Sequence, residues 1–288
     1  MLKGKIKPYI LITPIMIIIL GIFVTGLIMG FIQSLGHFKA IGLNGFTLKY
    51  YKEVLTSKDF LSSLGFSFYI SIVSSVIAVV LGILLSYSIF RIDSKRKTID
   101  FMYKFPIIVP HIVAVLLVYN ILVQNGILPR ILYFIGLIKE PFQFPSLLYE
   151  KNGVGIIIAY LWKEVPFVAM VTYTILGNLS YNLSEVALNL GATNRQVFFH
   201  VFLPLIMPSV LSAFIIIFAF SFGAYEVPFL LGATSPKALS VKAFIEYSNP
   251  DLTNRPYAMV INMILTFLSF ILVGLYQKTF ELISKYKG

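Results

Sequence analysis

Two neighbouring charges, Lys163 and Glu164, lie near the middle of a long apolar run at residues 153–178. Charged side chains in an apolar medium are costly, which makes them candidates for functional groups. Successive residues on a helix point about 100° apart, so the two charges cannot face one partner in the same way. Either one of them lines a path for a polar ligand, or they are held by an ion pair or a hydrogen bond to another helix.

Tyr225 and Glu226 form a second candidate pair, between another apolar run and Pro228. A carboxylate beside an aromatic ring suits a cation, through charge pairing and cation–π attraction. The more ordinary interpretation is a solvated loop acid, and the sequence favours it somewhat over a ligand for a substrate.

The sequence contains no recognisable catalytic or metal-binding pattern. The chain has no cysteine, and His111, the one histidine within an apolar run, has no second ligand at metal-binding spacing. We expect His111 to have a hydrogen-bonded packing role. No glycine-rich phosphate loop, nucleophile elbow or zinc-binding helix occurs, so neither a catalytic residue nor a cofactor is expected in this chain.

The elements that must carry these residues are apolar runs long enough to cross a membrane. Hydrophobic residues make up 58% of the chain and charged residues 12%, and the mean hydropathy is +0.88. A spanning helix needs about 20 apolar residues, and the candidates are 9–34, 62–90, 105–124, 153–178, 201–224 and 258–277. The runs are continuous rather than alternating, which predicts an all-α membrane protein with six transmembrane helices. The first run is expected not to be a cleaved signal peptide, because it is too long and no small-residue cleavage site follows it.

The positive charges predict an orientation in the membrane. With both termini inside, the segments 1–7, 91–104, 179–200 and 278–288 hold 12 Lys and Arg in 54 residues, whereas the outer loops hold 10 in 88. Positive residues concentrate on the cytoplasmic side of membrane proteins, so we expect a multi-pass protein with cytoplasmic termini. This topology explains the net charge of +11 better than a nucleic-acid partner does, because the basic residues lie between apolar runs.

The cytoplasmic segment at 179–200 has the pattern of two short helices joined by a turn. Asn182 or Ser184 can cap the first helix by accepting a hydrogen bond from its backbone. Glu185 then lies in the first turn, where a carboxylate favours the positive end of the helix dipole. Gly191 is expected to end this helix, because glycine tolerates left-handed dihedral angles.

A second short helix is expected from Asn194 to about Phe199. Leu203 and Pro204 then start the fifth span, since proline is tolerated in a first turn. Such a hairpin could dock on a partner as a rigid knob, with the small Ala187 allowing close approach. The alternative is an ordinary amphipathic helix at the membrane interface.

The spacing over residues 185–204 resembles the "EAA" loop of permease subunits of binding-protein-dependent ABC importers. The family pattern is Glu-Ala-Ala, three residues, Gly, nine residues, an aliphatic residue, one residue and Leu-Pro. The matching positions here are Glu185, Ala187, Gly191, Val201, Leu203 and Pro204. Val186 replaces the alanine at the second position of the pattern, directly after the glutamate. In the family this loop docks on a cytoplasmic ATPase, so the resemblance implies that these residues couple the chain to such a partner.

Two further motifs extend the resemblance to about residues 60–280. Trp162, Pro166 and Phe167 resemble the W-x-x-x-P-F pattern of many such permeases. The residues LGA at 190–192 resemble the polyamine, iron and related anion permeases more than the sugar permeases. The residues SFGAYEVPFLLGA at 221–233 are similar to the polyamine permeases, where a proline and LLG follow an aromatic residue. The chain therefore most resembles a permease of a type I importer in the spermidine/putrescine group.

The resemblance implies a single permease domain over residues 1–288, with spans two to six as the core and the first span outside it or against a partner. It implies half of an ATP-driven translocation pathway in a bacterial plasma membrane, with ATP and Mg²⁺ bound by a separate ABC ATPase dimer. A second permease subunit, expected to be a different chain, and an extracytoplasmic solute-binding protein would complete the importer. The expected substrate is a polyamine or another small organic solute; iron, thiamine and phosphonate-type substrates stay open, as does a homodimer of permeases.

The alternative function, from another class, is an ion-coupled secondary transporter. It would need coupling acids or a sodium site within the spans, usually with inverted repeats. Glu164 is the one acid of that kind, and no repeat is visible in the sequence. A membrane-embedded enzyme is a third class, but the sequence has no catalytic constellation.

Overall fold

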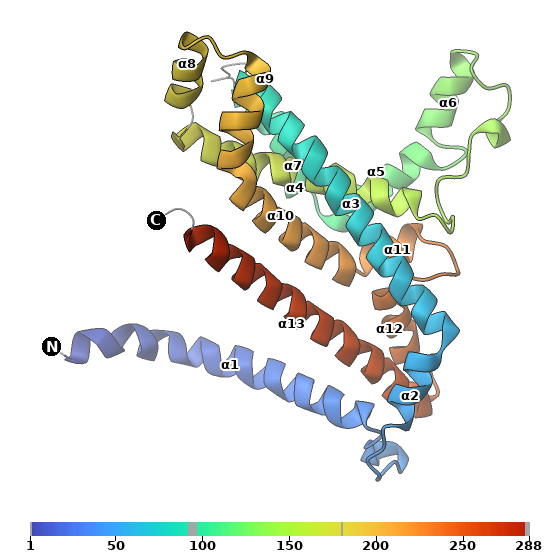
Figure 1. The fold of residues 1–288 in the computed structure, drawn as a ribbon. Coiled ribbons are helices and arrows are strands. Elements are labelled where there is room, and N and C mark those ends of the chain that lie inside the picture. The colour runs from blue at the N-terminus through green and yellow to red at the C-terminus, as the bar shows by residue number, and fades with distance from the viewer. Residues whose placement is uncertain (1, 92–96, 180, 286–288) are drawn as a thin grey trace. The chain divides into compact units, whose positions relative to one another are not determined.

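The computed structural model describes residues 2–91, 97–179 and 181–285, and most of them are helical (Figure 1). Within these residues, the helical segments long and apolar enough to cross a membrane number six: Pro8–Ser34, Lys58–Arg91, His111–Phe134, Val154–Ile175, Asn194–Gly223 and Leu252–Lys278. The predicted all-α fold with six spans is confirmed. Helices suit lipid because they satisfy their own backbone hydrogen bonds.

The predicted third span at 105–124 is wrong in its boundaries. The helical path breaks at Val109 and Pro110, between α4 (Lys97–Ile108) and α5 (His111–Leu122). Proline lacks a backbone N–H and disfavours helical geometry in the residue before it, so the path is interrupted there. The apolar segment instead runs on through α6 (Ile127–Phe134).

The fifth span begins earlier than predicted. α10 (Leu203–Gly223) starts at Leu203 as expected, but α9 (Asn194–Val197) and a π-helical turn at Phe198–Phe202 lead into it without a break. Pro204 has no N–H to offer the preceding turn, and its ring crowds the carbonyl four residues earlier. A π-helical turn is wider than an α-helical one, so it accommodates the missing hydrogen bond and the proline ring within a continuous helix.

Contacts divide the chain into two compact units, Met1–Leu61 with Lys242–Phe267, and Ser62–Val241 with Leu268–Gly288. Three helices contribute to both units: α3 (Lys58–Arg91), α12 (Leu239–Tyr247) and α13 (Arg255–Lys285). The single domain expected over 1–288 stays a prediction.

The first unit joins the long α1 (Leu2–Ser34) and the short α2 (Lys49–Thr56) to the beginnings of α3 and α13. Its polar contacts lie near helix ends: Tyr257 donates to Glu53 Oε2 at 2.5 Å, and Lys242 pairs with Asp59. The apolar side chains along α1 are largely exposed, as contact with lipid requires. Short 3₁₀ turns lie in the loops at Lys39–Ile41, Pro141–Gln143 and Leu252–Asn254.

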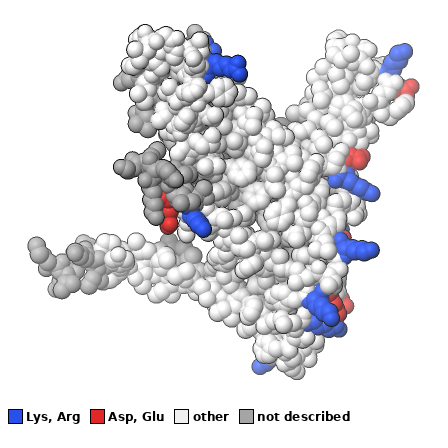
Figure 2. All heavy atoms as spheres, in the orientation of Figure 1, with Lys and Arg blue, Asp and Glu red and all other residues white. Residues whose placement is uncertain are grey.

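The second unit has its core where α3, α7 (Val154–Leu179) and α10 meet. Gly82 of α3 faces Val168 of α7 so closely that a Cβ at position 82 would lie 2.6 Å from the Val168 Cβ. Ala78, Val168, Ala213 and Ile217 form a buried cluster at the same level. Small residues at helix contacts are typical of membrane bundles, because they let backbones approach. Figure 2 shows one face of the molecule on which uncharged atoms predominate.

Candidate functional site

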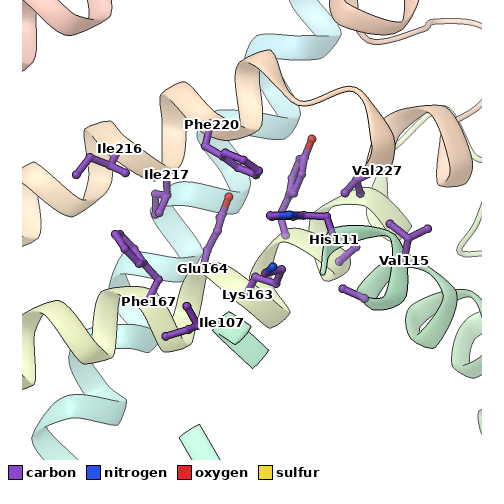
Figure 3. Close-up of a pocket in the computed structure, with 13 residues that line it drawn as sticks. Ile107, His111, Val115, Lys163, Glu164, Phe167, Ile216, Ile217, Phe220 and Val227 are labelled. Carbon is purple, nitrogen blue, oxygen red and sulfur yellow. The ribbon is translucent and has the colours of Figure 1, made fainter. Parts of the chain in front are cut away.

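A cavity of about 220 Å³ lies among helices of the second unit, with walls from α4, α5, α7, α10 and α11 (Glu226–Leu231). Its lining is mainly apolar, and three side chains that can carry charge reach it: His111, Lys163 and Glu164. Figure 3 shows these three side chains beside one another, surrounded by apolar groups such as Phe167 and Phe220. A mostly apolar cavity with a few convergent polar groups is the usual form of a ligand-binding site.

Glu164 is the most deeply buried charge-bearing group of this cavity, with a relative exposure of 5%. Its Oε1 accepts a hydrogen bond from the Ser221 hydroxyl of α10. The Tyr160 hydroxyl donates to the Ser221 backbone oxygen at 3.2 Å, which holds the same segment of α10 against α7. Within the described part of the chain, Glu164 Oε2 has no hydrogen-bond partner. One carboxylate oxygen therefore fixes the side chain, and the other is buried.

Lys163 points to a different partner, as the 100° offset between neighbours requires. Its Nζ donates to the backbone oxygen of Val109 at 2.6 Å, at the break between α4 and α5. No ion pair joins Lys163 to Glu164 among the residues that the structure describes. Both side chains line the cavity, and both are hydrogen-bonded to residues outside α7. Lining a ligand path and holding another part of the chain in place were the two alternatives for this pair, and they are therefore compatible.

His111 begins α5 directly after Pro110. Its ring packs against Phe220 with centroids 4.8 Å apart, which agrees with the packing part of the expected role, whereas the expected hydrogen bond stays a prediction. Among the described residues, no group of three or more His, Asp and Glu side chains could hold a metal ion.

Tyr225 and Glu226 lie where α10 ends and α11 begins. The Tyr225 ring stacks on Phe229 with centroids 4.9 Å apart, and partial burial raises the pKa of its hydroxyl above the ordinary value. Glu226 is exposed and does not line the cavity. The next residue, Val227, does line it. The structure thus places Glu226 beside the cavity, in solvent.

The predicted hairpin at 179–200 is present, and Figure 1 shows α8 (Tyr181–Asn189) and α9 beside each other. Gly191 has φ +90°, and the amide of Ala192 donates to the Ala187 oxygen at 3.0 Å. This is the hydrogen bond of a helix ended by a left-handed residue. The predicted role of Gly191 in the turn is confirmed.

The predicted start of the first helix is wrong. α8 begins at Tyr181, so Ser184 lies inside it and neither Asn182 nor Ser184 is the cap. Glu185 consequently lies in the second turn, exposed, and not in the first. α7 ends at Leu179 and α8 already begins at Tyr181, so residues 182–185 lie within the helix and not at its start.

Thr193 caps α9, a feature that the sequence reasoning missed. Its hydroxyl accepts from the Gln196 amide at 3.3 Å, and Gln196 Oε1 accepts from the Thr193 amide at 2.8 Å. This reciprocal arrangement is a capping box. The spacing Thr-x-x-Gln was the available signal.

An exposed apolar face on α8 was also missed. Leu183, Val186 and Leu190 are 49%, 54% and 83% exposed. Leu183 and Val186, spaced i and i+3, share one face of α8, and Leu190 directly follows the last residue of the helix, Asn189. Ala187 is half-buried on this helix, whereas Leu203 and Pro204 lie at the start of α10. The predicted coupling residues are therefore split between the hairpin and the span that follows it.

Residues 78–281 match the family described as "Binding-protein-dependent transport system inner membrane component". The Haemophilus influenzae spermidine/putrescine transport system permease protein PotB is 24% identical over 214 residues, covering 74% of this chain and 72% of that protein. A probable sulfate transport system permease protein cysT of Marchantia polymorpha is 24% identical over 228 residues, covering 77% and 76%.

The fold resembles a chain in the crystal structure of a bacterial alginate ABC transporter in complex with an alginate pentasaccharide-bound periplasmic protein. The TM-score is 0.77 at 20% identity, over 99% of this chain and 95% of that one. The fold and the family together define a multi-pass permease subunit of a type I ABC importer. The chain belongs to the family of binding-protein-dependent transport system inner membrane components, which decides against the ion-coupled secondary transporter.

Proposed function

We propose that this permease forms half of an ATP-driven translocation pathway and receives the motion of a cytoplasmic ATPase through the α8–α9 hairpin. The observation that carries this proposal is the exposed apolar face of Leu183, Val186 and Leu190 on that hairpin. The hairpin is fixed at its turn by Gly191 and at its second helix by the Thr193 cap. A rigid apolar helix face that fits a groove is a common mode of protein recognition, and an apolar patch in water otherwise favours aggregation.

The remaining partners follow from the same proposal. ATP and Mg²⁺ would be bound by an ABC ATPase dimer, and this chain would carry out no hydrolysis itself. A second permease, a different chain, would supply the other half of the pathway, and both termini and the hairpin would be cytoplasmic. An extracytoplasmic binding protein would deliver the substrate, by analogy with the alginate transporter, which was crystallised in complex with a periplasmic protein.

We propose a polyamine or another small organic cation as the substrate, with Lys163, Glu164, Tyr225 and Glu226 along its path. Two features support this: the carboxyl group of Glu164 among the residues that line the cavity, and a relative named for spermidine and putrescine. A relative named for sulfate and the ammonium group of Lys163 at the same cavity make an anion the competing substrate class.

The docking proposal is tested by purifying the permease with its ATPase and comparing two leucine variants. Leu190→Ser removes an apolar group that is 83% exposed on the hairpin, and the control Leu137→Ser removes one that is 70% exposed after α6. We expect Leu190→Ser to lose the ATPase during purification and to lose stimulation of ATP hydrolysis by the binding protein. Leu137→Ser should retain both. Retention of the ATPase and of stimulated hydrolysis by Leu190→Ser would exclude docking through this face.

A further inference from the structure

A second cavity in this unit, of about 290 Å³, lies where α3 ends and α9 begins. Arg91, the last residue of α3, and Arg195 of α9 both line it, so two guanidinium groups from distant parts of the sequence share one space. In the view of Figure 2, blue side-chain atoms are visible beside α8 and α9.

The aromatic residues of this cavity hold its two sides together and position the arginines. The Tyr87 hydroxyl donates to the Asn194 backbone oxygen at 3.2 Å, which ties α3 to α9. The Arg91 guanidinium carbon lies 5.9 Å from the centre of the Tyr87 ring, and that of Arg195 lies 6.0 Å from the Phe199 ring. Each guanidinium group therefore lies over a ring close to it in the sequence.

Neither arginine is neutralised by an acid within the parts of the chain that the structure describes, and both are exposed. Guanidinium groups are planar donors that match the oxygens of a phosphate with paired hydrogen bonds. Two of them on one cavity, without a carboxylate, favour an anion that carries several acceptor oxygens.

The position of the cavity adds a second requirement, because it lies at the ends of two helices that are long and apolar enough to span a membrane. One apolar span ends at Arg91 and another begins at Asn194. Leu84 lies two helical turns deeper, about 10 Å along the axis, and it is 50% exposed, as is Phe199. The cavity thus has a doubly positive end at the ends of the two helices, the expected membrane boundary, and an exposed apolar wall farther along them.

We propose that this cavity binds one anionic phospholipid, with its phosphate held by Arg91 and Arg195 and an acyl chain against Leu84 and Phe199. A free phosphate would use the arginines but not the apolar wall, and an acidic protein surface would not reach below the boundary. Basic pockets between spans are a known form of lipid headgroup site. The proposal requires that the chain spans a membrane, and it is independent of the ATPase docking and of the substrate.

The test measures lipid binding to the full-length permease in neutral detergent, by native mass spectrometry with short-chain phosphatidylglycerol and phosphatidylcholine. Phosphatidylglycerol should bind more tightly to the wild type. Arg91→Gln and Arg195→Gln should each weaken it about fivefold, and the double variant about 25-fold. The control Lys278→Gln removes an exposed cation at the end of another span, outside the cavity, and should change nothing.

Two further measurements keep the proposal falsifiable if the double variant does not fold. Arg91→Lys keeps the charge but loses the paired hydrogen bonds, and should give an intermediate affinity. Inorganic phosphate should displace phosphatidylglycerol poorly, because it cannot occupy the apolar wall. Equal binding of both lipids, unchanged binding in the single arginine variants, or efficient displacement by inorganic phosphate would each overturn the lipid site. Loss of the ATPase from the arginine variants with unchanged lipid binding would assign these residues to a protein partner instead.

Discussion

Lys163 of α7 donates a hydrogen bond of 2.6 Å from Nζ to the backbone oxygen of Val109, the residue directly after α4. The carbonyl end of a helix favours a positive charge, and the carbonyls there have no partner within the helix. Pro110 follows and interrupts the path before α5. One side chain of α7 therefore holds the broken segment between α4 and α5 in place beside the cavity.

Removing this ammonium group should destabilise the permease. Lys163→Met keeps most of the side-chain volume but removes the donor to the carbonyl of Val109, a residue that is only 9% exposed. The expected loss is about 1–3 kcal/mol of unfolding free energy, seen as a lower unfolding temperature in detergent. Lys278→Met, at an exposed position, is the control and should leave that temperature unchanged. Equal unfolding temperatures for both variants would mean that the hydrogen bond contributes nothing.

The contact between Ser221 and Glu164 predicts a second stability effect. Ser221→Ala removes the donor to a buried carboxylate, at an expected cost of about 1.5–3 kcal/mol, the range for hydrogen bonds to charged groups. Ser212→Ala on the same helix removes only a local hydrogen bond to the Pro208 oxygen at 3.1 Å and should be close to neutral. A loss in Ser212→Ala as large as that in Ser221→Ala would contradict a special role for the Glu164 contact.

Lys163 and Glu164 could be singled out from the sequence, but their hydrogen-bond partners could not. A charge within an apolar run is visible in the sequence, so both residues could be singled out from the residue order alone. Their partners could not, because a backbone oxygen at Val109 and a common hydroxyl at Ser221 carry no pattern of their own. Contacts between residues more than 50 positions apart are decided by packing of the spans.

The hairpin shows the same division between local and long-range information. Gly191 could be predicted because its left-handed conformation is a local property of glycine. The Thr193–Gln196 box and the spacing of Leu183, Val186 and Leu190 were equally local and could have been predicted. The π-helical turn before Pro204 could not, since a proline can start a helix or be absorbed within one, and the surrounding packing decides which.

Gly191→Ala should impair coupling more than folding. A Cβ at this position meets nothing within 4 Å, so the only penalty is the φ of +90°, about 1–2 kcal/mol for a residue with a Cβ. Gly136→Ala is a matched control, with φ +76° and equally open space. Both variants should reach the membrane at similar abundance, and only Gly191→Ala should reduce binding-protein-stimulated ATP hydrolysis. Equal stimulated hydrolysis in the two variants would show that the conformation of the turn at Gly191 is not needed for coupling.

Cysteine labelling should place the hairpin in the cytoplasm, because the positive charges concentrate on that side. The chain has no native cysteine, so single cysteines at Asn189 and Ser146, both exposed, report without background. Ser94, in the segment at 91–104 that is expected to be cytoplasmic, would be another site for an inner cysteine, but it lies outside the described residues. An impermeant thiol reagent on intact cells should label position 146 and not 189. The reverse pattern would invert the topology and remove α8 from any cytoplasmic ATPase.

Glu226→Gln tests whether the substrate is a cation that passes the end of α10. The exposed carboxylate lies at the opposite end of α10 from the hairpin, next to Tyr225 and to Val227, which lines the cavity. A cation approaching the cavity from this end would meet the carboxylate, and a charge pair at an exposed position contributes at most about 1 kcal/mol.

The variant keeps the shape of the side chain and removes its charge. In vesicles containing the complete importer, the spermidine concentration for half-maximal uptake should rise, by about fivefold at most, with basal ATP hydrolysis unchanged. Glu150→Gln, another exposed loop acid, is the control and should behave as the wild type. Wild-type spermidine uptake by Glu226→Gln at every concentration would make Glu226 a solvated loop acid and weaken the case for a cationic substrate. Uptake of sulfate rather than spermidine would show that the substrate is an anion, and Lys163 rather than Glu226 would then be the residue expected to select it.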